Sequence, residues 1–152
     1  MRRLAILFLC CVLFVPLAEA TEGRILKVLP HFLDLKGRAS VSPSLYDRDA
    51  YQAQLRKNPT ERSGLRFDVQ WKANSPKTLE LQMILQVRGV AKGDIPKELV
   101  LEKAVKQKGW LSHWEGIKLD EAEYQSIGEV TAWRVSLWDG DKFLGDQKSF
   151  LW

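Results

Sequence analysis

The chain has little of the chemistry that carries catalysis or covalent cross-links. It holds two cysteines and two histidines in 152 residues. Both cysteines, Cys10 and Cys11, lie in the apolar N-terminal stretch, so residues 21–152 contain none. This excludes disulfides, thiolate metal sites and a cysteine nucleophile from that part of the chain. A domain without cross-links depends on its core, and a chain of roughly 130 residues buries about two-thirds of its unfolded surface.

The N-terminus carries the pattern of a secretory signal. Arg2 and Arg3 give a positive start, residues 4–17 are almost continuously apolar, and Ala18-Glu19-Ala20 offers small residues to a signal peptidase. We therefore expect residues 1–20 to be a signal peptide, and the protein to be periplasmic or extracellular in a bacterium. A membrane anchor needs about 20 apolar residues. We therefore expect no stable membrane span after cleavage.

Long blocks of charge of one sign are also missing. Residues 21–152 carry 21 basic and 18 acidic side chains, a net charge of +3. The densest basic group is Lys103, Lys106 and Lys108, and the other cations are scattered along the chain. A nucleic-acid-binding domain usually concentrates its cations in a patch or stripe. We therefore expect no nucleic-acid partner.

What the sequence does contain is alternation of apolar and polar residues. Apolar residues occupy every second position of 79–88 and of 65–71, which is the pattern of half-buried strands. The turn residues Asn74-Ser75-Pro76 follow the first of these runs along the chain. We expect the two runs to pair as antiparallel neighbours with one solvated face. Five further strands are expected at 25–35, 98–105, 110–119, 130–138 and 142–152.

Two helical insertions interrupt these strands. Ser44 is suited to cap a helix that ends near Lys57, before Asn58-Pro59. We expect Tyr46, Ala50, Tyr51 and Leu55 of this helix, at about 44–57, to pack over a sheet edge. The second insertion is one turn after Asp120, whose spacing to Glu123 is that of a capping box.

The number and order of these elements resemble an immunoglobulin-like fold. About seven strands, a helical turn before the sixth and a closing hairpin are similar to that antiparallel β-sandwich. The resemblance is architectural, because the antibody-type cysteines are absent. We expect residues 21–152 to form a single, mainly β domain of this kind.

The C-terminal segment is expected to be the closing hairpin. Asp139-Gly140 is a strong turn signal between apolar strands. We expect Phe150 and Trp152 to anchor the chain end to the core. The nearby acidic residues lack the alternating spacing and closing Glu of a calcium loop. Since no phosphate loop or dinucleotide fingerprint is present either, we expect no metal and no cofactor.

Residues 109–116, with the sequence GWLSHWEG, hold the candidate for chemistry, His113. Ser112 and Glu115 lie beside it, which suggests a hydrolase triad. Neighbours on a strand point to opposite faces, however, and triads are assembled from separate elements. We therefore expect no catalytic residue, and we keep a small secreted hydrolase using His113 as the alternative. The other histidine, His31, is expected to be structural.

The same segment offers a binding site made of Trp110, His113 and Trp114. The tryptophans suit an aromatic platform for a glycan or a partner peptide, since they supply large contact area at low entropic cost. The competing interpretation is that both tryptophans fill the core, as we expect for Trp71 and Trp133, and a sandwich without disulfides favours it. The leading hypothesis is an exported, non-catalytic module that binds a protein or glycan in the bacterial cell envelope. The sequence leaves the ligand and the oligomeric state open.

Overall fold

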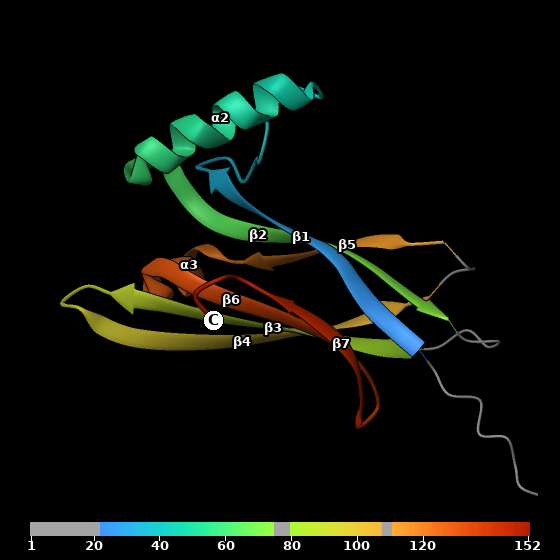
Figure 1. The fold of residues 1–152 in the computed structure, drawn as a ribbon. Coiled ribbons are helices and arrows are strands. Elements are labelled where there is room, and N and C mark those ends of the chain that lie inside the picture. Colours follow the sequence, from blue (N-terminus) through green and yellow to red (C-terminus); the bar gives the residue numbers. More distant parts are fainter. Residues whose placement is uncertain (1–21, 75–79, 108–110) are drawn as a thin grey trace, which may run out of the picture.

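A computed structural model of the chain shows two antiparallel sheets packed face to face (Figure 1). It describes residues 22–74, 80–107 and 111–152, so the expected signal peptide, residues 1–20, lies outside the described residues. The strands are β1 (Glu22–Asp34), β2 (Arg62–Asn74), β3 (Glu80–Ala91), β4 (Ile95–Lys106), β5 (His113–Leu119), β6 (Glu129–Asp139) and β7 (Lys142–Lys148). The helices are α2 (Leu45–Lys57) and α3 (Glu121–Ile127), and a 3-10 turn spans Pro59–Glu61. In these ranges, no helix combines the length and the apolar character that a membrane crossing requires.

The strand order confirms the expected β-sandwich with a helical insertion. One sheet has the order β1-β2-β5 and the other β4-β3-β6-β7. In a constant-type immunoglobulin domain the fourth strand shares a sheet with the first, second and fifth. Here β4 pairs with β3 instead, which gives one sheet of three strands and one of four.

The expected pairing of 65–71 with 79–88 is wrong, because β2 and β3 belong to different sheets. Alternation shows that each strand has one buried face, but it does not identify the strand beside it. The apolar faces of β2 and β3 meet across the sandwich rather than side by side. A turn signal between two runs therefore indicated a reversal of the chain and not a hairpin.

The core lies between the sheets. Its largest fully buried side chains include Trp71 and Phe67 from β2 and Met83 and Leu85 from β3. Burying a side chain of this size contributes roughly 1.5–3 kcal/mol, so the central strands provide much of the stability that disulfides would otherwise supply. Trp71 is in the core as expected, whereas Trp133 is half-buried and packs against the margin of the core.

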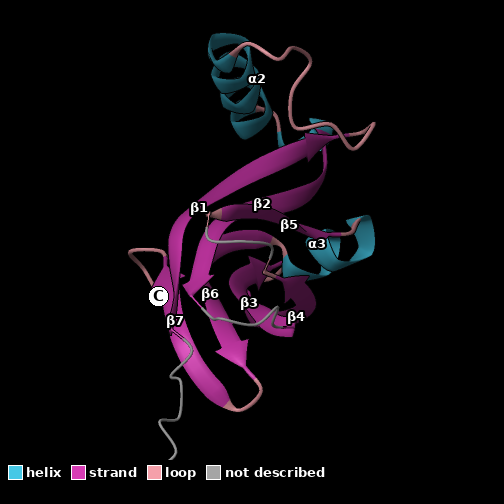
Figure 2. Cartoon of the chain, turned by 90° about the vertical axis from the view of Figure 1, so that its right-hand side faces the viewer, coloured by secondary structure: helices cyan, strands magenta, loops and turns pink. Residues whose placement is uncertain are grey.

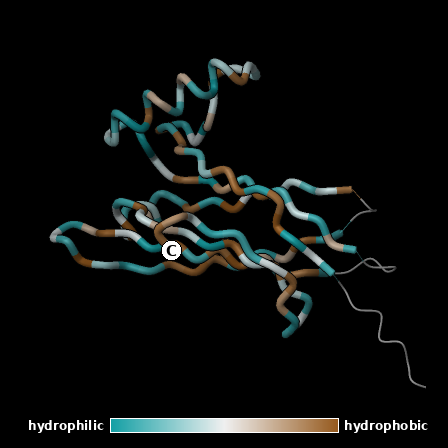
Figure 3. The backbone as a smooth tube through the Cα atoms, in the orientation of Figure 1, coloured by the Kyte–Doolittle hydropathy of each residue, from teal (hydrophilic) through white to brown (hydrophobic). Residues whose placement is uncertain are grey.

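Helix α2 stands outside the sandwich, beyond the three-stranded sheet (Figures 1 and 2). Ser44 caps it as expected, accepting a hydrogen bond from Asp47 N at 3.4 Å. Figure 3 shows it as a largely hydrophilic helix, and its buried residues are Gln52 and Leu55. The expected packing of Tyr46 and Ala50 is wrong, because both residues are exposed. Leu55 is buried as expected, and the half-buried Tyr51 donates a hydrogen bond from its hydroxyl to Asp34 of β1 at 2.7 Å.

The closing hairpin is present, but the expected anchoring of the chain end to the core is wrong. Gly140, with φ of 56°, makes the turn between β6 and β7. The strand ends at Lys148, and Phe150 in the following turn is fully exposed, so its expected burial is wrong. Trp152 is half-buried, but its ring centre lies 3.9 Å from the Arg88 guanidinium on the outer face of β3, away from the core cluster. The alternation that predicted burial of Phe150 stops where the strand stops.

Candidate functional site

The two sheets diverge at one end and leave a cleft of about 950 Å³ between them. Its upper side is formed by the end of β1, the 3-10 turn and the start of β2. Its lower side is formed by α3, β6 and Ser149. In Figure 1 this is the end at which β2 curves away from the four-stranded sheet toward α2.

Aromatic side chains from four elements line the cleft. Phe67 of β2 is fully buried at its base, where it meets Trp133 of β6 edge to face at 6.0 Å between ring centroids. Phe32 of β1 and Tyr124 of α3 are half-buried at the sides. Such rings offer large apolar surfaces with a preferred contact geometry. The cleft can therefore hold an apolar side chain of a ligand.

Arg62 connects the elements that form the upper side of the cleft. Its guanidinium lies 4.1 Å from the centre of the Phe32 ring, a cation–π contact. The same group donates hydrogen bonds to the carbonyl oxygens of Leu55, at 2.5 Å, and of Arg56. These carbonyls belong to the last turn of α2, which has no intrahelical donors for them. Arg62 therefore joins α2, β1 and β2 at the rim.

Helix α3 forms the opposite wall. Asp120 and Glu123 make the expected capping box, with both backbone N–H bonds at 2.8 Å, although the helix spans seven residues rather than one turn. Gly128 ends the helix at φ of 71°, and a Cβ there would overlap the Val90 carbonyl oxygen. The helix is thus held closely against β3. This close packing makes the wall a fixed part of the cleft.

The cleft also borders an incompletely paired strand. β6 pairs with β3 along its length, but with β7 only from Arg134 onward. Ser149 continues the β7 side by one residue, since its N–H donates to Trp133 O at 2.9 Å. Residues 129–132 therefore have no neighbouring strand on that side among the described residues. Val130 and Thr131 from this stretch line the cleft.

The predicted site residues lie elsewhere, at the opposite end of the three-stranded sheet. His113 and Trp114 pair with Trp71 and Gln70 of β2, far along that strand from Leu65 and Phe67 of the cleft. Trp114 is 51% exposed on the outer face, so the interpretation that it fills the core is wrong. Its position follows from strand parity, which turns it outward while Ile117 and Leu119 turn inward. Trp110 lies outside the described residues.

The side chains around His113 have separate partners. The His113 ring lies against Trp71, with 5.5 Å between centroids. Ser112 Oγ accepts a hydrogen bond from Gln70 at 3.1 Å, and Glu115 pairs with Lys103 at 2.6 Å. These contacts do not assign His113 a chemical role.

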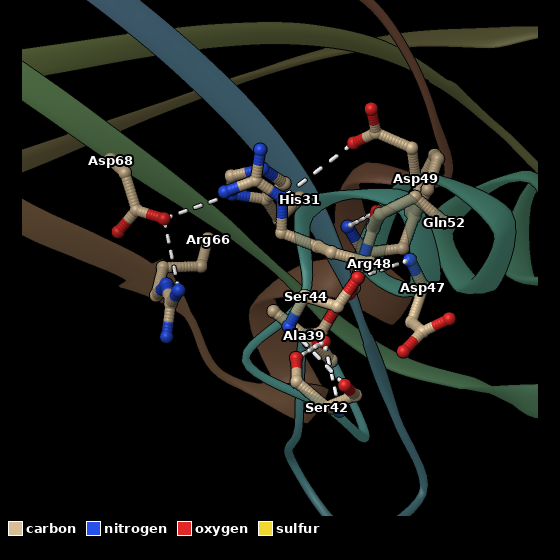
Figure 4. A network of polar contacts seen from close by, with 12 residues as sticks. His31, Ala39, Ser42, Ser44, Asp47, Arg48, Asp49, Gln52, Arg66 and Asp68 are labelled. Carbon is tan, nitrogen blue, oxygen red and sulfur yellow. Dashed lines mark hydrogen bonds and ion pairs between the residues drawn. The ribbon is translucent and has the colours of Figure 1, made fainter.

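A polar network joins the outer face of the three-stranded sheet to the region beneath α2 (Figure 4). His31 Nδ1 lies 2.9 Å from Asp68 Oδ2, and Arg66 donates to the same oxygen at 2.9 Å. Burial by itself raises the pKa of Asp68, but the hydrogen bonds from His31 and Arg66 outweigh it and hold that pKa below its usual range. His31, which is buried, thus has a structural partner as the sequence suggested.

Carboxylates in the described ranges do not gather into a cation site. There, no three His, Cys, Asp or Glu side chains lie close enough to hold a metal ion. Asp120 and Glu123 cap α3, and Asp146 pairs with Arg134 at 2.7 Å.

The chain was compared with known proteins, and neither a protein-family model nor a curated protein matches it. The cleft itself was missed by sequence reasoning. Phe32, Tyr124 and Trp133 come from three distant segments, and each fits an ordinary amphipathic element. The one local signal was the early end of the β7 alternation at Lys148, which leaves part of β6 without a neighbour.

Proposed function

We propose that the protein is a non-catalytic binding module that holds an extended peptide segment of a partner protein in this cleft. The observation that carries the proposal is the juxtaposition of an aromatic-lined cleft and an unpaired stretch of strand. Residues 129–132 offer backbone hydrogen-bonding groups on the side that β7 leaves open. Phe32, Tyr124 and Trp133 offer apolar contacts beside them.

Strand addition explains why both features occur together. An added strand gains affinity from main-chain hydrogen bonds, and pockets for alternate side chains give specificity. Here the peptide backbone lies beside residues 129–132 of β6, in the position that β7 leaves open, and one apolar side chain enters the cleft. Arg56, Glu121 and Glu129 lie at the rim, where they can pair with oppositely charged side chains of the peptide. With the signal-like N-terminus, the partner is a protein of the bacterial cell envelope.

The proposal is tested by selecting peptides from a random phage-displayed library against the full chain. The selected peptides are expected to share an apolar residue within an extended pattern and to lack proline beside it. Binding is then measured with Gln125→Trp, which places a large ring at the mouth of the cleft. Occlusion is expected to weaken binding about tenfold or more, which corresponds to about 1.4 kcal/mol.

The matched control is Ser126→Trp, on the same helix and exposed but outside the cleft lining. It is expected to change the affinity less than about twofold, within the range of a neutral surface substitution. Equal weakening by both substitutions, or an affinity for the selected peptides that Gln125→Trp does not change, would rule out the cleft as the binding site.

A further inference from the structure

The fold gathers on one outer face basic side chains that the sequence scatters. The register places Arg24 opposite Lys72 and Lys118 opposite Arg66. The cations of this outer face of the β1-β2-β5 sheet, which we call the basic face, are Arg24, Lys27, Arg66, Lys72 and Lys118. Its carboxylates in the described strands are Glu22, at the first residue of β1, and Asp68, which already holds His31 and Arg66.

The other outer face of the sandwich carries no excess of positive charge. Its strands carry the cations Arg88, Lys106, Arg134 and Lys148, and the carboxylates Glu80, Glu98, Glu102, Glu129 and Asp146. Lys106 pairs with Glu80 at 2.7 Å and Arg134 with Asp146 at 2.7 Å. On the basic face, by contrast, Arg24, Lys27, Lys72 and Lys118 form no ion pair with any described residue. Of the two outer faces, the basic face therefore carries the excess of cations among the described strand residues.

The basic face also presents an aromatic ring. Trp114 lies in the same row as Gln70 and Lys27, because these residues are register partners across the three strands. Neighbouring strands are about 4.8 Å apart and same-face residues about 6.7 Å apart along a strand. The exposed indole thus lies within one or two rows of Lys72, Lys27 and Arg66. A ligand that contacts the cations also reaches Trp114.

The shape of this face favours a narrow ligand. Helix α2 rises over the same side of the sheet at the His31 end, as Figures 1 and 4 show. Arg48 extends from α2 on that side, and its Nε lies 3.6 Å from Asp49. A flat membrane or a rigid duplex is obstructed by the helix. A single flexible chain can lie along the strands beside it.

We propose that the basic face binds a linear polyanionic glycan, a sugar chain bearing carboxylate or sulfate groups. The cations of β1 and β2 pair with successive anionic groups, and Trp114 stacks on a sugar ring. The chemistry of single-stranded nucleic acid fits less well. Its binders stack successive bases on several aromatic side chains, whereas Trp114 is the one tryptophan, tyrosine or phenylalanine among the described residues of this face. This surface is separate from the cleft and does not rest on the proposed peptide binding.

The first test is titration of the full chain with dextran sulfate, a sulfated sugar polymer, at several salt concentrations. The double substitution Lys27→Glu with Lys72→Glu is compared with Lys97→Glu and Lys148→Glu, which change the net charge equally on exposed residues of the other sheet. The first pair is expected to weaken binding more than about tenfold and to reduce the salt dependence, since each contact between a cation and a sulfate group releases counterions, as contacts with phosphate do. Equal weakening by the two pairs overturns the proposal. Lys27→Gln with Lys72→Gln replaces the first pair if thermal unfolding shows that it is misfolded.

The second test distinguishes recognition of the sugar ring from recognition of negative charge. Trp114→Ala is expected to weaken dextran sulfate binding about threefold to tenfold, the order of one stacking contact, and to leave the affinity for polyglutamate, which has no sugar ring, unchanged. Poly-dT of matched charge is expected to bind more weakly than dextran sulfate. Tighter binding of poly-dT, or no effect of Trp114→Ala on dextran sulfate, overturns the assignment to a glycan.

Discussion

At the scale of single residues, Asp34 connects the end of β1 to α2. Its carboxylate accepts hydrogen bonds from the N–H groups of Lys36 and Arg38, the Arg38 side chain and the Tyr51 hydroxyl, at 2.7–2.9 Å. Burial by itself raises the pKa of Asp34, but these hydrogen bonds together hold it well below its usual range. Charge-assisted bonds of this kind are stronger than neutral ones. The loop that leads to α2 is therefore organised around one ionised group.

The lowered pKa of Asp34 predicts a loss of stability in acid. A group with a depressed folded-state pKa stabilises the fold above its unfolded pKa of about 3.9 and loses that contribution as the pH falls below it. Asp34→Asn is expected to lower the free energy of unfolding by about 2 kcal/mol at pH 7, and to flatten its decline between pH 4 and pH 2. Urea denaturation at each pH measures this. If Asp34→Asn is no more harmful than Asp141→Asn, in the hairpin turn, Asp34 does not have this role.

At the scale of elements, α2 depends on one side chain for its main polar attachment. Gln52 accepts from Phe32 N at 2.8 Å and donates to Phe32 O at 2.9 Å and to Ala39 O at 2.7 Å. The amide thus substitutes for a strand neighbour at the edge of β1, and helix and sheet are joined where an edge would otherwise be open. Because Phe32 also lines the cleft, the attachment of α2 fixes one wall of the site.

Gln52→Ala is expected to loosen α2 without unfolding the sandwich. Buried backbone groups that lose their partners cost about 1–3 kcal/mol, and that loss falls on the junction between helix and sheet. Amide hydrogen exchange should accelerate in 35–57 and stay slow in β3 and β6. Gln54→Ala is the control, since the Gln54 side chain donates to Glu61 in an exposed hydrogen bond on the same helix-and-turn segment. Unchanged exchange in α2 of the Gln52 variant would show that other contacts hold the helix.

The helices also show what local signals can and cannot predict. The cap at Ser44 and the capping box of Asp120 and Glu123 were read correctly, because the groups involved are three residues apart in the chain. The face of α2 that meets the sheet was not, because Gln52 docks by hydrogen bonding, and hydrophobicity gave no indication of it. Of the residues expected to do this, Leu55 is buried, whereas Tyr46 faces solvent.

At the scale of the whole molecule, alternation predicted seven strands and a sandwich but not their neighbours. Every strand with one buried face satisfies the pattern equally, so β2 and β3 were assigned to the same sheet. The cleft and the basic face could not be predicted for the same reason, because both depend on which strands are neighbours. Phe32 and Trp133 line one cleft from opposite sheets, and Lys27, Lys72 and Lys118 share one face of a sheet, through long-range register alone.

In the proposed binding mode, a peptide strand occupies the open side of β6 at the cleft. Amide hydrogen exchange of the full chain, with and without a peptide selected for binding, tests it most directly. Residues 129–132 and the cleft-lining end of β1 are expected to exchange more slowly when the peptide is bound, while the outer edge of β4 is unaffected. Protection confined to β4 or to the basic face, with no change at 129–132, would rule out strand addition at β6.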